Sequence, residues 1–102
     1  MWLLRSSDDA LASHTFRILP GNIKTIGRAT GADFIVDASL VSRLHCRLSA
    51  GAAELEVVDL DSTNGTYVNG KRVDRSTLQS GDALGVGEVQ LIVSRAESDG
   101  RA

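Results

Sequence analysis

The sequence predicts an all-β fold, a sandwich or a barrel, and two observations lead to this prediction. Apolar and polar residues alternate with a period of two in several short runs, and turn-forming residues interrupt these runs every several positions. No long stretch has the period of an amphipathic helix. The chain has 102 residues, 42% of them hydrophobic, which suits one domain with a core of its own.

Turn signals divide the chain into short expected strands. Pro20-Gly21-Asn22 marks one turn, and a strand at 66–68 is expected because two Asn-Gly pairs, Asn64-Gly65 and Asn69-Gly70, enclose it. Asn and Gly tolerate the positive φ that sharp turns require. In chain order the expected strands are 1–5, 15–19, 23–26, 33–36, 43–48, 54–57, 66–68, 84–86 and 89–93.

The clearest alternation lies in the fifth of these runs. Leu44, Cys46 and Leu48 hold alternate positions and are expected to face the core. His45 and the two arginines that flank it in the alternation are expected on the opposite face. The apolar side of 54–57 should pack in the same core layer.

Composition and charge exclude several function classes. Eleven basic and thirteen acidic residues give a net charge of −2, whereas a non-specific nucleic-acid binder is usually clearly basic. No run approaches the roughly 20 apolar residues that a membrane span needs, and residues 1–5 lack the pattern of a signal peptide. We therefore expect a cytoplasmic protein with no nucleic-acid or membrane partner.

The cysteine, histidine and arginine content bears on the compartment, on metal binding and on the source of the protein. The single cysteine, Cys46, has no internal disulfide partner, which fits a reducing compartment. No metal is expected, because His14 and His45 are far apart and no cysteine or carboxylate stands at ligand spacing from His45. Nine of the eleven basic residues are arginine, and alanine, glycine and leucine abound, which indicates a bacterial source.

Three polar clusters fall in loops or at strand ends: Gly27-Arg28, 42–45 and 62–65. The loops of a β-sandwich gather at its two ends, so these clusters can meet at one end. Together they offer a guanidinium, hydroxyls, a carboxamide and backbone N–H groups. A doubly charged oxyanion suits this set, because arginine presents a planar fork to two phosphate oxygens and the other donors fill the remaining lone pairs.

The three clusters belong to one ordered motif: Gly27-Arg28, then Ser42-x-x-His45, then Asp59-Leu60-x-Ser62-Thr63-Asn64-Gly65-Thr66-x-Val68-Asn69-Gly70. With this motif the chain resembles the forkhead-associated (FHA) domain family over roughly residues 1–95. The resemblance implies a β-sandwich of the SMAD/FHA type with about eleven short strands and binding loops at one end. It also implies that residues 1–95 form a phosphopeptide-binding domain, and residues 96–102 are expected to be a polar, flexible tail.

The resemblance also implies roles for individual residues. Phosphate binding is implied for four of them: Arg28, Ser42, Arg43 and Thr63. Asn64 would bind the peptide backbone beside the phosphothreonine. A structural role in the loops is implied for five more: Gly27, His45, Gly65, Asn69 and Gly70. Leu40 lies where some members of the family read the third residue after the phosphothreonine.

The function expected from this resemblance is phosphothreonine-dependent protein interaction, as a signalling adaptor downstream of a Ser/Thr kinase and without a cofactor. One alternative is an assembly domain that uses a sheet face and ignores phosphorylation. A second is a hydrolase with Ser42 as nucleophile, His45 as base and Asp59 or Asp61 as orienting acid. Against it, Ser42 and His45 would face opposite ways if the strand began at Ser42, and no Gly-x-Ser-x-Gly elbow surrounds the serine.

Overall fold

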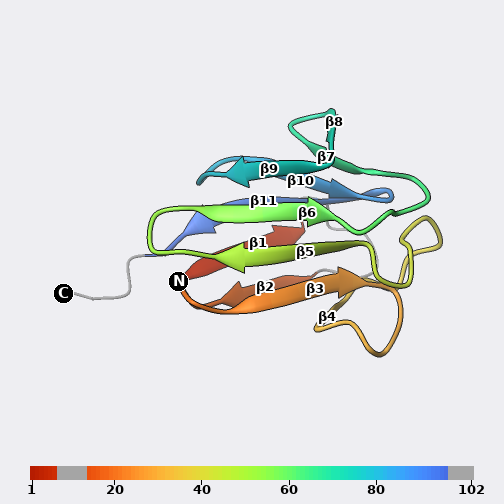
Figure 1. Ribbon diagram of the computed structural model, residues 1–102, viewed down its shortest axis with the longest axis horizontal. Coiled ribbons are helices and arrows are strands. Elements are labelled where there is room, and N and C mark those ends of the chain that lie inside the picture. Colours follow the sequence, from red (N-terminus) through yellow and green to blue (C-terminus); the bar gives the residue numbers. More distant parts are fainter. Residues whose placement is uncertain (7–13, 97–102) are drawn as a thin grey trace.

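The computed structural model describes residues 1–6 and 14–96. Eleven short strands lie within these residues (Figure 1). The strands are β1 (Trp2–Ser6), β2 (Thr15–Ile18), β3 (Ile23–Gly27), β4 (Phe34–Ile35), β5 (Cys46–Ala50), β6 (Leu55–Asp59), β7 (Thr66–Val68), β8 (Lys71–Val73), β9 (Arg75–Leu78), β10 (Ala83–Val86) and β11 (Val89–Arg95). Within those residues there is no helix, and hence none that could cross a membrane. The expected tail at 96–102 lies, apart from residue 96, outside the described residues.

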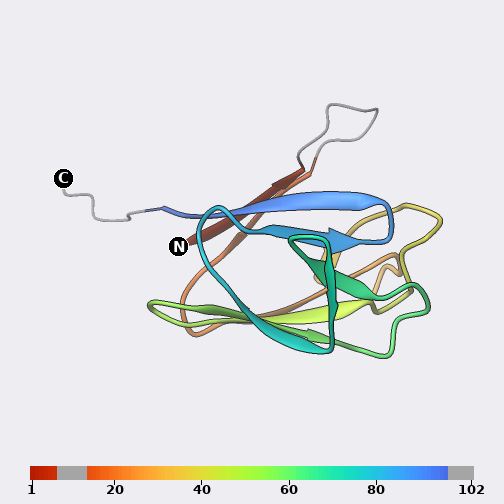
Figure 2. The ribbon, with the colours of Figure 1, turned by 90° about the horizontal axis from the view of Figure 1, so that it is seen from above.

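Two sheets pack face to face, as Figure 2 shows from above. The six-stranded sheet has the order β2-β1-β11-β10-β7-β8, and the five-stranded sheet has the order β4-β3-β5-β6-β9. The registered strand pairs are antiparallel except β3 with β4, which is parallel. The predicted all-β sandwich of about eleven strands is confirmed.

The core fills the space between the sheets. Alternate residues of β1, β5 and β6 are buried, and Leu48 lies opposite Val57 in one sheet and Leu4 opposite Val93 in the other. Each fully buried side chain of this kind stabilises the fold by roughly 1.5–3 kcal/mol. Trp2 is 1% exposed, and its indole N–H donates to the Gly51 carbonyl at 3.0 Å, which satisfies its one polar atom.

The expected strand at 43–48 is wrong at its start. Cys46 and Leu48 are in the core as predicted, but β5 begins only at Cys46. Leu44 is 47% exposed and His45 is fully buried, the reverse of the expected alternation. The period breaks because the backbone N–H of Ser42 donates to the His45 ring, which holds 42–45 in an irregular bend.

Two further strands, β8 and β9, were not expected from the sequence, because their residues are largely polar and exposed. The turn that leads into β8 was expected: Asn69 and Gly70 have φ values of 53° and 84°, which suits a two-residue hairpin. In the other Asn-Gly pair only Gly65 has a positive φ, 91°. The φ of Asn64 is not positive.

The first and last strands close the fold at the end away from the long loops. The backbone N–H of Ala96 donates to the Met1 carbonyl at 2.8 Å, and the Met1 amino group lies 3.4 Å from the Ala96 carbonyl. β1 and β11 are paired along their length. The beginning and the end of the described fold therefore lie side by side.

Candidate functional site

Three loops meet at one end of the sandwich, at the same side in both views (Figures 1 and 2). They are 28–33 after β3, 36–45 before β5, and 60–65 between β6 and β7. A hollow of about 140 Å³ lies among them. Its lining is Arg28, Ser39, Leu40, Val41, Ser42, Thr63 and Asn64. Four of the residues expected in the site are thus brought together.

The first two loops are tied by hydrogen bonds. The backbone N–H of Arg28 donates to the Ser42 carbonyl at 2.9 Å, and the Arg28 Nε–H donates to the Val41 carbonyl at 3.0 Å. Because Nε is held by protein, the two Nη groups are left for a ligand, and they can form the fork that phosphate oxygens accept. Arg28 is exposed, so a ligand can reach that fork.

Gly27 lets these two loops approach so closely. A Cβ placed on Gly27 would lie 2.0 Å from the carbonyl oxygen of Arg43, far inside van der Waals contact. Its φ is not in the left-handed range, so the requirement for glycine comes from the close approach of two backbones. This is the kind of loop-structuring role expected for Gly27.

The second and third loops are joined through Ser42 and Asn64. The Thr63 N–H donates to the Ser42 Oγ at 3.0 Å, and the Asn64 side-chain amide donates to the Leu40 carbonyl at 3.0 Å. Since the Ser42 oxygen accepts a bond from protein, its hydroxyl proton remains available to a bound oxyanion. Asn64 keeps its carbonyl and a second amide hydrogen for a ligand.

His45 lies beneath the hollow and braces the same two loops. Its Nδ1 accepts from the Ser42 N–H at 3.0 Å, and its Nε2 lies 2.8 Å from the Gly65 carbonyl oxygen. The first contact needs an acceptor and the second a donor, so these partners assign the neutral ring with its proton on Nε2. The His45 carbonyl also accepts from the Leu60 N–H at 2.9 Å.

A polar network inside the third loop was missed in the sequence. The Asp59 carboxylate accepts hydrogen bonds from the Ser62 N–H at 3.1 Å, from the Ser62 hydroxyl at 2.5 Å and from the Thr66 hydroxyl at 2.7 Å. The Ser62 oxygen in turn accepts from the Gly65 N–H at 3.0 Å. An aspartate three residues before a serine is the signal that could have indicated it, because such side chains cap loop N–H groups.

This network sets the charge state of Asp59. Burial alone would raise the pKa of its carboxyl, but the hydrogen bonds from Ser62 and Thr66 outweigh burial, so the pKa lies below its ordinary value. Asp59 is therefore ionised at neutral pH, and its partner Ser62 is buried and does not line the hollow.

Besides Gly27 and His45, four expected site residues do not line this hollow. Arg43 lines a neighbouring hollow beside Leu44. Asn69 and Gly70 form the β7–β8 turn, where the Asn69 Oδ1 accepts from the Ala83 N–H at 2.9 Å. Gly65 lies on the inner side of the third loop and is buried.

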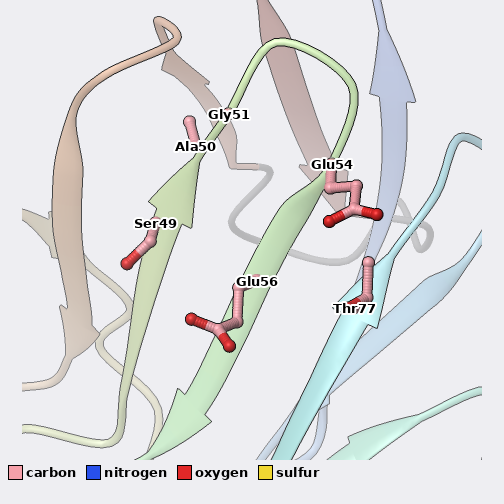
Figure 3. A pocket seen from close by; sticks show the side chains of 6 residues that line it. All are labelled: Ser49, Ala50, Gly51, Glu54, Glu56 and Thr77. Carbon is pink, nitrogen blue, oxygen red and sulfur yellow. The ribbon is translucent and has the colours of Figure 1, made fainter.

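The far end of the five-stranded sheet has the opposite electrostatic character. A hollow of about 340 Å³ lies there between β5, β6 and β9, and Figure 3 shows the carboxylates of Glu54 and Glu56 projecting over it. The Glu56 carboxylate forms an ion pair with Arg75 at 3.3 Å. Carboxylates disfavour a phosphate dianion, whereas a guanidinium such as that of Arg28 at the other end favours one. The described residues contain no cluster of His, Cys, Asp or Glu suited to a metal ion.

The sandwich and its loop site define an FHA domain, and the model of the FHA domain family matches residues 24–87, more than half of the chain. The chain belongs to this family, as its motif predicted. Among solved structures it resembles the FhaA FHA domain in complex with the intracellular domain of another protein, with 31% identity and a TM-score of 0.82. That match covers 91% of this chain and 99% of the other.

The curated relatives are bacterial. The chain is 40% identical over 68 residues to an oxoglutarate dehydrogenase inhibitor of Corynebacterium efficiens, covering 67% of this chain and 48% of that protein. It is 39% identical over 66 residues to the glycogen accumulation regulator GarA of Mycolicibacterium smegmatis, covering 65% and 42%. It is also 38% identical over 78 residues to an ABC transporter ATP-binding/permease protein of Mycobacterium tuberculosis, covering 76% and 9%. The chain spans about half or less of these relatives.

Proposed function

We propose that this FHA domain binds a phosphothreonine-containing segment of a partner protein and serves as a signalling adaptor downstream of a Ser/Thr kinase. The observation that carries the proposal is the hollow in which Arg28, Ser42, Thr63 and Asn64 meet. The names of the relatives support it, since an enzyme inhibitor and a regulator of glycogen accumulation are regulatory proteins. A solved structure of phosphothreonine-dependent FHA domain interactions, 30% identical with a TM-score of 0.81, supports the ligand class.

In this proposal each side chain has a separate task. The Arg28 Nη groups and the Ser42 hydroxyl donate to the phosphate, the Thr63 hydroxyl adds a donor at the rim, and Asn64 binds the peptide backbone beside the phosphothreonine. Well-placed charge-assisted hydrogen bonds contribute about 1.5–3 kcal/mol each. Three or four of them, less the free energy lost on association, give a micromolar affinity of about −8 kcal/mol.

The preference for phosphothreonine over phosphoserine depends on one methyl group. Its burial contributes about 0.8 kcal/mol, which is a few-fold in affinity. A larger preference requires that the β-branch also fix the side-chain rotamer of the bound residue.

A non-enzymatic role follows from the partners of His45. The expected argument from opposite strand faces does not apply, because β5 begins only at Cys46. Instead, one His45 nitrogen is occupied by the Ser42 backbone N–H and the other by the Gly65 carbonyl. The Ser42 hydroxyl oxygen contacts the Thr63 N–H. The histidine therefore has no nitrogen with which to take the hydroxyl proton of Ser42, which a serine nucleophile would need.

The proposal also covers the cellular location of the protein and the bounds of its binding domain. We place the protein in the cytoplasm, where a Ser/Thr kinase and its substrates meet, and the single cysteine supports this. The binding domain is taken as residues 1–95, since strands at both ends of this range, β1 and β11, pair within one sheet.

The test is a binding screen with phosphothreonine peptides beside matched phosphoserine and unphosphorylated peptides. Arg28→Ala is expected to weaken phosphopeptide binding by about tenfold to a hundredfold, because it removes a charge-assisted contact. Arg17→Ala, an exposed arginine on β2, is the matched control and should bind as the unchanged protein does. Binding that ignores phosphorylation, or that survives Arg28→Ala, would contradict the proposal and favour an assembly domain that uses a sheet face.

A further inference from the structure

The hollow lined by Arg28, Ser42, Thr63 and Asn64 is called the phosphate hollow below, and a second hollow lies beside it, lined by the residues that follow Arg28 and Ser42 in the chain. It has a volume of about 540 Å³ and is lined by Ala29, Thr30, Gly31, Arg43 and Leu44. Pockets that take small ligands or side chains typically measure about 300–1,000 Å³. The hollow is large enough for a side chain of a bound peptide.

Leu44 gives this hollow an apolar wall. Its side chain is 47% exposed, although the sequence pattern expected it in the core. A single exposed leucine needs no explanation by itself. Here, however, His45 occupies the buried position for structural reasons, and the neighbouring leucine is left facing outward into a hollow. Covering its exposed area with another apolar group is favourable.

Consecutive residues of two hydrogen-bonded segments line the two hollows. Arg28 and Ser42 line the phosphate hollow, and their backbones are joined by an N–H···O bond of 2.9 Å. The next residues, Ala29 and Arg43, line the second hollow and are joined in the same way at 3.1 Å. A peptide whose phosphate lies on Arg28 and Ser42 therefore passes the second hollow within a few residues. Leu40 belongs to the phosphate hollow and not to the second one.

We propose that the second hollow binds an aliphatic or aromatic side chain of the phosphothreonine peptide, on the side of the phosphothreonine away from Leu40. This inference rests on the proposed function. The charge at the rim defines the class of side chain further: the Arg43 guanidinium repels lysine and arginine, whereas Leu44 and Ala29 form a surface that an apolar group covers. The domain then reads two features of its partner, a phosphate and an apolar residue nearby.

Gly31 provides a direct test. Gly31 lines the hollow, a Cβ on it meets no atom within 4 Å, and its φ is not in the left-handed range, so a larger side chain is accommodated there without strain. Gly31→Leu should block the hollow from within, and Leu44→Ser should remove its apolar wall. Leu19→Ser, which changes a leucine 55% exposed on another part of the surface, is the matched control.

The probe is an alanine-based peptide with a central phosphothreonine, in which leucine replaces alanine at each of about four positions on either side. For the unchanged protein, leucine at one or two positions on one side should tighten binding by about tenfold, as expected for partial burial of such a side chain. Gly31→Leu and Leu44→Ser should each reduce this gain to less than about threefold, while binding stays phosphorylation-dependent. Leu19→Ser should leave the gain unchanged.

The outcomes separate the two proposals. Phosphorylation-dependent binding without any gain from leucine, or with a gain that both variants retain, would overturn the second subsite and leave the proposed function standing. Binding that does not depend on phosphate would overturn both. Circular dichroism on each variant establishes that the fold is intact, and Leu44→Ser provides the result if Gly31→Leu does not fold.

Discussion

The backbone N–H of Thr63 donates a hydrogen bond to the hydroxyl oxygen of Ser42 at 3.0 Å, joining two loops that are 21 residues apart in the sequence. The Ser42 oxygen thus joins the two loops and leaves its hydroxyl proton available for donation. Together with the His45 contacts to Ser42 and Gly65, this bond means that the loops are already arranged before a peptide arrives. Less free energy is then lost to ordering when the peptide binds.

Ser42→Ala should affect binding and stability together. The change removes a donor to the phosphate and leaves the Thr63 N–H without its acceptor. We expect at least about a tenfold loss of phosphopeptide affinity and a fall of about 1 kcal/mol in the free energy of unfolding. Calorimetric titration and urea unfolding measure the two effects. Ser49→Ala, at the far end of β5, is the control, and unchanged affinity in Ser42→Ala would exclude the hydroxyl from the site.

The stability of the third loop should depend on pH through Asp59. The pKa of its carboxyl is lowered in the folded protein, so its contribution is present above the unfolded pKa of about 3.9 and is lost as the pH falls through the lower folded value. The free energy of unfolding should therefore decrease on acidification below about pH 4, and less steeply in Asp59→Asn. Urea unfolding between about pH 7 and about pH 3 tests this, with the exposed Asp74→Asn as control. Identical slopes in all three proteins would count against the network.

Gly27→Ala should destabilise the domain, because the added methyl collides with the Arg43 carbonyl 2.0 Å away. Two backbone segments would have to separate, and overpacking of this kind costs about 1–3 kcal/mol. Gly31→Ala is the matched control: nothing lies within 4 Å of its Cβ, and surface changes of this type stay within about 0.5 kcal/mol. Thermal unfolding of both variants compares them directly. Equal melting temperatures would show that the loops can part without loss.

Cys46 should be inert in the folded protein. Burial, and then the nearby charge of Asp59, raise the pKa of its thiol to about 12, and its side chain has no exposed surface. Because the thiolate is the reactive form, iodoacetamide should label Cys46 at neutral pH only as fast as the fold opens. Mass spectrometry follows the labelling, with the urea-unfolded protein as the reference. Labelling of the native protein at the unfolded rate would contradict the buried position.

Much of the fold could be predicted, because alternating apolar residues are a property of strands that are half buried. This holds for Leu48 and Val57, which lie in the core as expected, and for the final hairpin, β10 with β11. It fails at Leu44 and His45, where a local hydrogen bond bends the backbone and ends the alternation. It also fails at β8 and β9, whose exposed residues carry no apolar pattern.

The candidate site could be predicted as a set of residue types but not as an arrangement. The motif predicted Arg28, Ser42 and Asn64 as site residues, since turn residues and polar donors are local features. Which of them share a hollow depends on contacts between loops, such as the Asn64 amide on the Leu40 carbonyl. For the same reason the Asp59–Ser62 network escaped notice, because its hydrogen bonds are satisfied inside the loop and have no counterpart in strand periodicity.

The pairing of Met1 with Ala96 has a consequence for how the fold can be used. A chain that enters at Met1 and leaves at Ala96 does so through two adjacent points, at the opposite end from the phosphate hollow (Figure 1). Such a fold can be spliced into a surface loop of a host protein, or circularly permuted through a short linker, without obstructing its ligand. The loops around the hollow and the two points of connection to a host protein lie at opposite ends of the domain, so the loops or the connections can be changed independently.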